Sequence, residues 1–201
     1  MFGTKVYELS LVKNYVSHWG MAEAVRELIQ NALDSSSPFV YEFAVDDTGD
    51  TYTLRLTSEF AQLSPQTLLL GATSKAENKD AIGSFGEGYK IALLVLTRLG
   101  YDVELLNAGL IWRPRFKFNK QFGEELLAIE ETQATTRGNS GLTFLVHGLS
   151  AADVEQVRAL IGRCGKGLLL HALLNANGLI TVDLISVALV HTRKASSRST
   201  R

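Results

Sequence analysis

Three polar residues share one face of a predicted helix near the start of the chain. Residues 21–33 place apolar side chains at helical spacing, and the Ser-Ser-Ser-Pro run at 35–38 would end the helix. Glu27, Asn31 and Asp34 stand at i, i+4 and i+7, on one helix face. A carboxylate can polarise a water for attack on phosphate, and an amide oxygen suits Mg²⁺, which prefers hard oxygen ligands. The alternative is an ordinary solvated helix face.

A glycine-rich loop is the second candidate. Residues 82–90 read Ile-Gly-Ser-Phe-Gly-Glu-Gly-Tyr-Lys and contain the pattern G-x-x-G-x-G. Glycines let a backbone approach a ligand closely, and a helix beginning near Tyr89 would direct free N–H groups at an anion. Lys90 or Lys75 would add positive charge. The pattern is neither the dinucleotide fingerprint nor a Walker A loop, and alone it is also typical of a surface loop.

In this order, the two motifs together resemble those of the GHKL superfamily, which includes gyrase, the heat-shock chaperone, histidine kinases and the mismatch-repair MutL proteins. The matching residues are Glu27, Asn31, Ala32 and Asp34 for the N-box, E-x-x-x-N-A-x-D, and Gly83, Gly86 and Gly88 for the second glycine box. Residues 71–75, Gly-Ala-Thr-Ser-Lys, resemble the lid entry of MutL-like and MORC-like members. The resemblance covers about residues 16–146.

The resemblance implies a fold and a set of roles. The implied fold is α+β, a two-layer α/β sandwich of the Bergerat type, with helices packed on one face of a mixed, mostly antiparallel sheet. Glu27 would be the catalytic general base, and Asn31 would hold Mg²⁺ against the phosphates of ATP. The implied nucleotide-binding residues are Asn31, Asp34, Ser58, Lys75, Gly83, Phe85, Gly86, Glu87, Gly88, Tyr89, Lys90 and Thr143.

Two places depart from the family pattern. Members carry D-x-G-x-G after the hairpin, and its Asp reads the adenine amino group. Here residues 56–63 read Leu-Thr-Ser-Glu-Phe-Ala-Gln-Leu, with Ser58 roughly at the position of that Asp. The later Gly-Thr pair is replaced by Gly141-Leu142-Thr143, and a one-residue slip turns a strand side chain to the other face. Thr143 therefore reaches the pocket only through a local bulge, and we expect an intact phosphate half with an altered base-reading half.

The remaining pattern predicts one domain over residues 1–190 and a disordered, basic, Ser-rich tail over 191–201. Residues 167–190 are apolar but contain Asp183, which is costly in a membrane, so we interpret them as core elements. The predicted strands are 39–45, 51–56, 103–106, 110–118, 125–130 and 142–146, and further helices are predicted at 89–99 and 151–161, with Ser150 as an N-cap.

Composition narrows the classes of function. The 201 residues carry a formal net charge of -1, which argues against bulk attraction to nucleic acid or acidic membrane. Cys164 is the only cysteine, so no intramolecular disulfide or cysteine metal cluster can form, and no signal peptide is recognisable. A cytoplasmic protein is expected. Residues 113–118 alternate basic with aromatic or proline side chains, which favours an amphipathic strand over a nucleic-acid surface.

Three functions remain open. The first is Mg²⁺-dependent ATP binding with slow hydrolysis, in which lid closure acts as a switch for a protein partner or a homodimer. The second is a nucleotide-binding interaction or regulatory module without useful turnover. The third is a protein kinase of the same superfamily. The 26 residues before Glu27 leave little room for the helical pair of a histidine kinase. A stand-alone serine kinase stays open but is less favoured, because the lid sequence at 83–88 is more similar to those of MutL-like and chaperone-like members.

Overall fold

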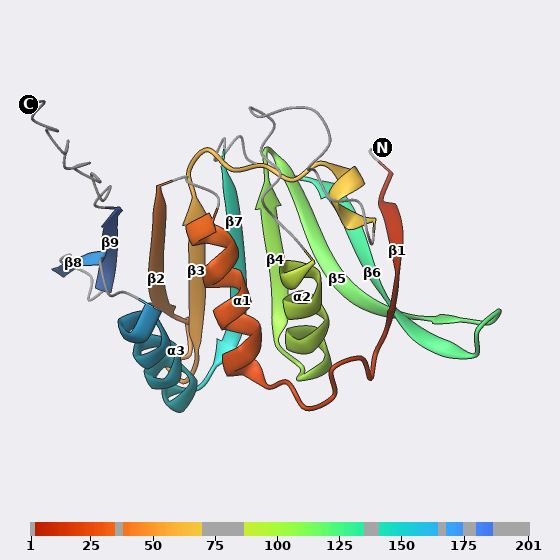
Figure 1. The fold of residues 1–201 in the computed structure, drawn as a ribbon, viewed down its shortest axis with the longest axis horizontal. Helices are drawn as coiled ribbons and strands as arrows, with labels where there is room; N and C mark the ends of the chain where they lie inside the picture. The colour runs from red at the N-terminus through yellow and green to blue at the C-terminus, as the bar shows by residue number, and fades with distance from the viewer. Residues whose placement is uncertain are drawn as a thin grey trace, which may run out of the picture.

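The computed structural model describes residues 3–34, 38–69, 87–134, 141–164, 168–174 and 180–186. These residues form nine strands, three α-helices and one short 3-10 helix (Figure 1). In chain order the elements are β1 (Lys5–Val12), α1 (Met21–Asp34), β2 (Phe39–Val45), β3 (Tyr52–Ser58), η1 (Pro65–Leu68), α2 (Gly88–Arg98), β4 (Asp102–Asn107), β5 (Leu110–Asn119), β6 (Glu124–Gln133), β7 (Leu142–Leu149), α3 (Ala151–Cys164), β8 (Leu168–Leu174) and β9 (Ile180–Ser186).

All nine strands belong to one sheet, in the order β1-β6-β5-β4-β7-β3-β2-β9-β8. Every pairing between neighbouring strands is antiparallel. Four of the pairs join strands consecutive in the chain, so short turns suffice, as at Ala108 and Gly109, both with positive φ. Pro114 lies in β5 beyond the last β4 pairing, at Trp112, so its missing N–H breaks no bond to β4.

The predicted fold class was wrong. Instead of a two-layer sandwich built on a mixed sheet, the described residues form a sheet-rich fold in which nine antiparallel strands accompany only three α-helices. The prediction of a mostly antiparallel sheet allowed for some parallel pairs, whereas hairpins and the insertion of β7 between β4 and β3 keep every neighbour antiparallel. The strand at 5–12 was not predicted, although Tyr7, Leu9 and Leu11 alternate with polar neighbours.

Most other elements were predicted within a few residues. The strand at 39–45 is confirmed over its full length, and the helices at 21–33, 89–99 and 151–161 are observed as α1, α2 and α3. The predicted N-cap at Ser150 is confirmed, because its Oγ accepts the Asp153 N–H at 3.2 Å. Residues 168–174 and 180–186 form strands, and no helix among the described residues is long and apolar enough to cross a membrane. The predicted tail at 191–201 lies outside the described residues.

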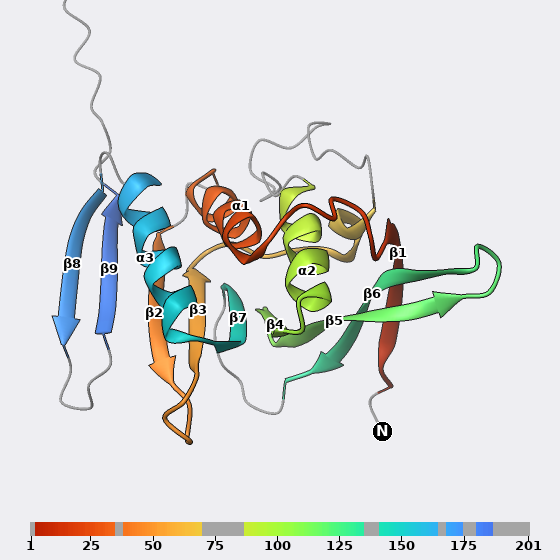
Figure 2. The same cartoon turned by 90° about the horizontal axis from the view of Figure 1, so that it is seen from below.

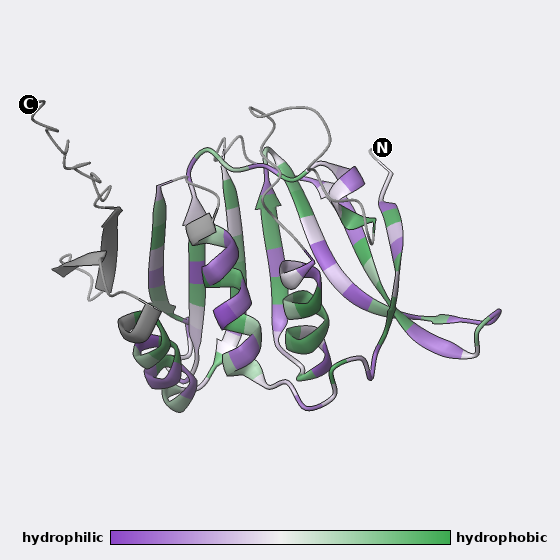
Figure 3. Cartoon of the chain, in the orientation of Figure 1, coloured by the Kyte–Doolittle hydropathy of each residue, from purple (hydrophilic) through white to green (hydrophobic). Residues whose placement is uncertain are grey.

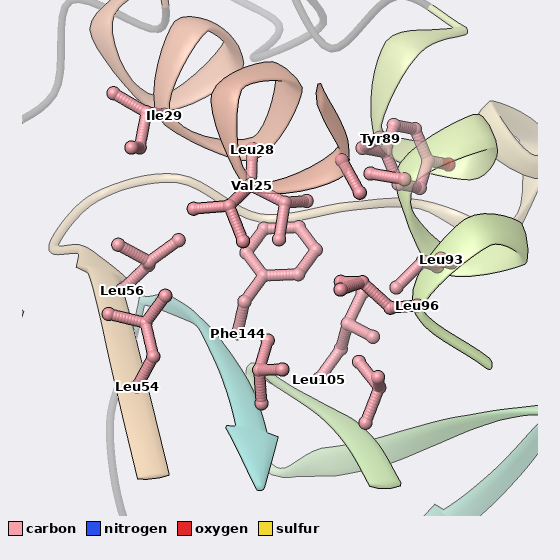
Figure 4. Close-up of a cluster of buried hydrophobic side chains, with 14 of the residues drawn as sticks. Val25, Leu28, Ile29, Leu54, Leu56, Tyr89, Leu93, Leu96, Leu105 and Phe144 are labelled. Carbon is pink, nitrogen blue, oxygen red and sulfur yellow. The ribbon is translucent and has the colours of Figure 1, made fainter. Parts of the chain in front are cut away.

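The helices lie side by side over the central strands (Figure 2), and α1 contacts both α2 and α3. Figure 4 shows Val25 and Leu28 of α1 and Leu93 of α2 meeting Leu56 of β3 and Phe144 of β7 in a common core. Helix α2 is apolar over most of its surface (Figure 3), since all its residues from Tyr89 to Leu96 except Ile91 are buried. This packing fixes α1 against α2.

The opposite surface of the sheet carries paired charges. Ion pairs join β5 to its neighbours β4 and β6, and β3 to β2: Arg113–Glu104, Arg115–Asp102, Lys117–Glu130 and Arg55–Glu42. The basic side chains of residues 113–117 therefore sit against acidic partners on the outer side of an amphipathic strand. Their paired state leaves little net charge for a nucleic-acid backbone.

Candidate functional site

The two sequence motifs meet where the first residue of α2 packs on α1. A Cβ built on Gly88 would lie 2.7 Å from Glu27 Oε2 and 3.2 Å from Asn31 Nδ2. Non-bonded carbon and oxygen atoms do not normally approach this closely, so any larger residue at this position would force the Glu27 carboxylate or the Asn31 amide to shift. Glu27, Asn31 and Gly88, called the α1–α2 cluster below, are thus brought together from distant parts of the chain.

Asn31 is held in one orientation by its own helix. Its Nδ2 donates a hydrogen bond of 2.7 Å to the backbone oxygen of Glu27, and the residue is 7% exposed. The carbonyl Oδ1 has no hydrogen-bond partner among the described residues. An amide oxygen fixed in this way suits a hard divalent cation such as Mg²⁺, which commonly takes one or two protein oxygens and keeps waters or phosphate oxygens for the rest.

The two carboxylate oxygens of Glu27 have different surroundings. Oε1 accepts a hydrogen bond of 3.2 Å from Arg26, whose guanidinium lies 5.9 Å from the centroid of the Trp19 ring. Oε2 faces the start of α2 at Gly88. The Glu27 side chain is 25% exposed, so water reaches it. Arg26 orients the carboxylate, and no sequence motif singled it out.

The start of α2 carries a backbone amide beside this cluster, at Gly88. The N–H groups of Lys90 and Ile91 both donate to the backbone oxygen of Glu87, so helical hydrogen bonding begins at these residues. The Gly88 N–H precedes them and has no partner among the described residues. A helix N-terminus carries partial positive charge, which favours an anion such as phosphate beside Gly88.

Ser58 lies at the end of β3 on the surface that faces the helices. Leu54 and Leu56 point toward α1 (Figure 4), and the regular register from Leu54 onward puts Ser58 on the same side. Ser58 is 4% exposed, and its hydroxyl has no partner among the described residues. Its neighbour on β7 is Leu142.

The segment after Ser58, where the family carries its D-x-G-x-G box, is bound by Asn107, which sequence reasoning missed, and passes close to Gly141. Asn107 at the end of β4 accepts the Leu63 N–H at 3.0 Å and donates to the Leu63 oxygen at 2.7 Å. A Cβ on Gly141 would collide with the backbone oxygens of Ser58 and Glu59. The only signal for Asn107 was a polar residue directly before an Ala-Gly turn.

Thr143 is not brought to the cluster. It pairs with Thr57, and the two hydroxyl oxygens lie 3.1 Å apart. Both residues alternate with the helix-facing Leu56, Ser58 and Phe144, so they lie on the opposite surface of the sheet. The register of β7 against β3 and β4 is regular around Thr143, so the bulge that would turn it inward is missing.

The rest of the predicted binding set divides into two groups. Lys75, Gly83, Phe85 and Gly86 lie outside the described residues, as does the side chain of Asp34. Glu87, Tyr89 and Lys90 are described and point elsewhere. Glu87 lines a cavity of about 240 Å³ between β1 and α2, together with Ser10, Leu11, Val12, Tyr15 and Ile91.

Tyr89 and Lys90 are directed at η1. The Tyr89 hydroxyl donates to the backbone oxygen of Thr67 at 3.1 Å, and the Lys90 ammonium donates to the backbone oxygen of Leu69 at 2.9 Å. Burial raises the pKa of Tyr89 to about 12. Burial also lowers the pKa of Lys90, although the nearby carboxylate of Glu87 acts in the opposite direction.

A metal at the α1–α2 cluster would have few protein ligands. The described residues contain no group of three or more His, Cys, Asp or Glu side chains able to hold a metal ion. Asn31 Oδ1 could be a ligand of Mg²⁺, and the carboxylate of Glu27 lies beside the same glycine. Such a sparse set fits a cation that the phosphates of a nucleotide would help to hold.

Comparison with known proteins adds one distant relative. No family model matches the chain. A protein of Mycoplasma pneumoniae, described as an uncharacterized protein, is 25% identical over 155 residues, which cover 74% of this chain and 62% of that protein. The chain thus spans about three fifths of the length of that relative.

Proposed function

We propose that the protein binds ATP with Mg²⁺ at the α1–α2 cluster and hydrolyses it slowly. The observation that carries this proposal is the contact of Gly88 with Glu27 and Asn31, which joins a carboxylate, an amide oxygen and a helix N-terminus in one place. The resemblance of the two motifs to those of GHKL ATPases supports the same ligand. In this proposal nucleotide binding switches the conformation presented to a protein partner or to a second copy.

Each group has a distinct part in the proposed reaction. The Gly88 N–H and the dipole of α2 bind a phosphate, and Asn31 Oδ1 holds the cation, which neutralises phosphate charge. Glu27 takes the proton from an attacking water, with its other carboxylate oxygen held by Arg26. No lysine among the described residues faces the cluster to stabilise charge on the terminal phosphate, which is consistent with slow turnover.

Calorimetric titration with ADP and a non-hydrolysable ATP analogue, with and without Mg²⁺, tests binding. Mg²⁺-dependent binding should be lost in Asn31→Ala and retained in Gln30→Ala, a control at an exposed position of the same helix. Glu27→Ala should keep binding but lower hydrolysis by a factor on the order of 100 to 10,000, the usual contribution of a general base. If the wild-type protein does not bind nucleotide at millimolar concentration, the proposal is contradicted.

A nucleotide-binding interaction module without turnover is the second candidate. It is favoured by the segment at 59–63, which lacks the glycines of an adenine-reading box. Asn107 bonds this segment at Leu63, and Gly141 lies against its beginning. If this candidate holds, Glu27→Ala will leave any residual hydrolysis unchanged. Comparing ATP with GTP, CTP and UTP tests base reading: a preference for ATP that Ser58→Ala removes would assign that role to Ser58.

A further inference from the structure

The first turn of α2 is bound on a second side, by η1. Tyr89 and Lys90 reach across to this short helix: the Tyr89 hydroxyl lies 3.0 Å from Thr67 Oγ1 and 3.1 Å from the Thr67 backbone oxygen, and the Lys90 ammonium lies 2.9 Å from the Leu69 oxygen. Tyr89 is 0% exposed and Lys90 is 2% exposed. We call Thr67, Leu69, Tyr89 and Lys90 the α2 clamp.

The clamp lies on a different side of α2 from the α1–α2 cluster. Successive residues of an α-helix are about 100° apart, so Lys90 projects about 200° away from Gly88. Gly88 faces Glu27 and Asn31 on α1, whereas Lys90 faces the end of η1. The turn that carries the Gly88 N–H therefore contacts α1 on one side and η1 on the other.

Joining two elements through a buried ammonium group costs free energy. Removing a charge from water costs several kcal/mol unless strong hydrogen bonds compensate, and a methionine would fill the same space without that cost. A polar bond differs from apolar packing because it fixes direction and distance. The Lys90 bond thus specifies where the first turn of α2 lies along its own axis.

We propose that Lys90 and Tyr89 are positioning residues, which fix the first turn of α2 so that the Gly88 N–H can bind phosphate, and that Lys90 itself does not touch the nucleotide. This inference rests on the proposed function and differs from the prediction that Lys90 supplies charge to the phosphates. A side chain that acts through Gly88 changes affinity by moving a backbone amide, whereas a phosphate ligand changes affinity by its charge.

Two measurements on wild type, Lys90→Met and Lys117→Met test the inference. Lys117 is the control, because Lys117→Met removes the same charge, here paired with Glu130, on the opposite surface of the sheet. The first measurement is hydrogen exchange of the amides at 88–91 without ligand. The second is titration with Mg²⁺ and a non-hydrolysable ATP analogue at low and high salt, which separates direct charge contacts from positioning.

Lys90→Met should speed exchange at 88–91 and weaken nucleotide binding by about tenfold, with the salt dependence of wild type, while Lys117→Met changes neither. Unchanged exchange in Lys90→Met would overturn the clamp. Weaker binding with a reduced salt dependence would overturn it too, by making Lys90 a phosphate ligand. If Lys90→Met does not fold, Tyr89→Phe, which removes the hydroxyl that bonds Thr67, must show the faster exchange. If the wild-type protein does not bind nucleotide, the proposed function is contradicted. The exchange data would still show whether Lys90 holds the first turn of α2 in place.

Discussion

The buried phenol of Tyr89 gives the α2 clamp a measurable signature in alkaline solution. Burial raises the pKa of this side chain to about 12, whereas an unfolded chain titrates near 10. Below pH 10 the phenol is neutral in both states, and its contribution to stability is complete. Between pH 10 and 12 the unfolded chain releases the proton that the folded protein retains, so stability falls as pH rises.

Tyr89→Phe separates this effect from the hydrogen bond. At pH 8 the variant should be less stable by about 1 kcal/mol, because it loses the bond to Thr67. Toward pH 11.5 the difference should shrink and then reverse, since a shift of about two units corresponds to about 3 kcal/mol that only wild type loses. Urea unfolding at several pH values measures both. Tyr7, Tyr41 and Tyr101 also have raised pKa values but are common to the two proteins, so a difference that stays constant with pH would contradict the expectation.

Some functional and structural residues could be predicted from the sequence, and others could not. Glu27, Asn31 and Gly88 were singled out by their spacing and by the resemblance of the two motifs to the GHKL pattern, and the structure brings the three together. Arg98 was missed, although its guanidinium donates to the backbone oxygens of four residues between Lys13 and Trp19 and so holds the turn that leads into α1. Such a residue has no local signature, since its partners lie about 80 positions away in the chain.

At the scale of elements, the distance between α1 and α2 depends on Gly88. Alanine at this position would favour a helix by about 1 kcal/mol, yet its Cβ would stand 2.7 Å from Glu27 Oε2. The side chains of Glu27 and Asn31 must move, or the helices must separate. We expect Gly88→Ala to destabilise the protein by about 1–3 kcal/mol and to abolish nucleotide binding, because both cluster residues are displaced.

Gly3→Ala is the matched control for that substitution. No heavy atom lies within 4 Å of a Cβ built on Gly3, so stability and binding should not change. Denaturant unfolding and the calorimetric titration are the measurements. A Gly88→Ala protein that is as stable as wild type and still binds nucleotide would contradict the expectation and would remove the support that Gly88 gives to the proposed function.

Elements were easier to predict than their arrangement. Strand and helix positions follow from local alternation, so 39–45 and the three helices were found. Strand order depends on pairings between distant segments: β7 enters between β4 and β3, and β1 pairs with residues 126–131 of β6. The face of Thr143 depends on the same register. No local pattern specifies such pairings, which is why the strand order and the fully antiparallel pairing were not predicted.

At the scale of the whole molecule, β1 and α1 join distant parts of the sheet into one structure. Leu9 and Leu11 of β1 belong to the same buried core as Val25 of α1 and Leu54 of β3. The two tryptophans report on different parts of it. Trp112 is fully buried in β5 and bonds Glu131 through its indole N–H, whereas Trp19 is partly buried and precedes α1.

If this core unfolds as one cooperative unit, both tryptophans must report the same transition. Fluorescence of Trp19→Phe follows Trp112 at the β1–β6–β5 end of the sheet, and fluorescence of Trp112→Phe follows Trp19 beside α1. In each variant the fluorescence midpoint in urea should coincide with the midpoint from circular dichroism. A Trp112 signal that changes at lower urea than the circular dichroism would mean that β1, β5 and β6 unfold separately. The α1–α2 cluster would then belong to a smaller unit formed by the helices and the central strands, and stability changes in β1 would leave nucleotide binding untouched.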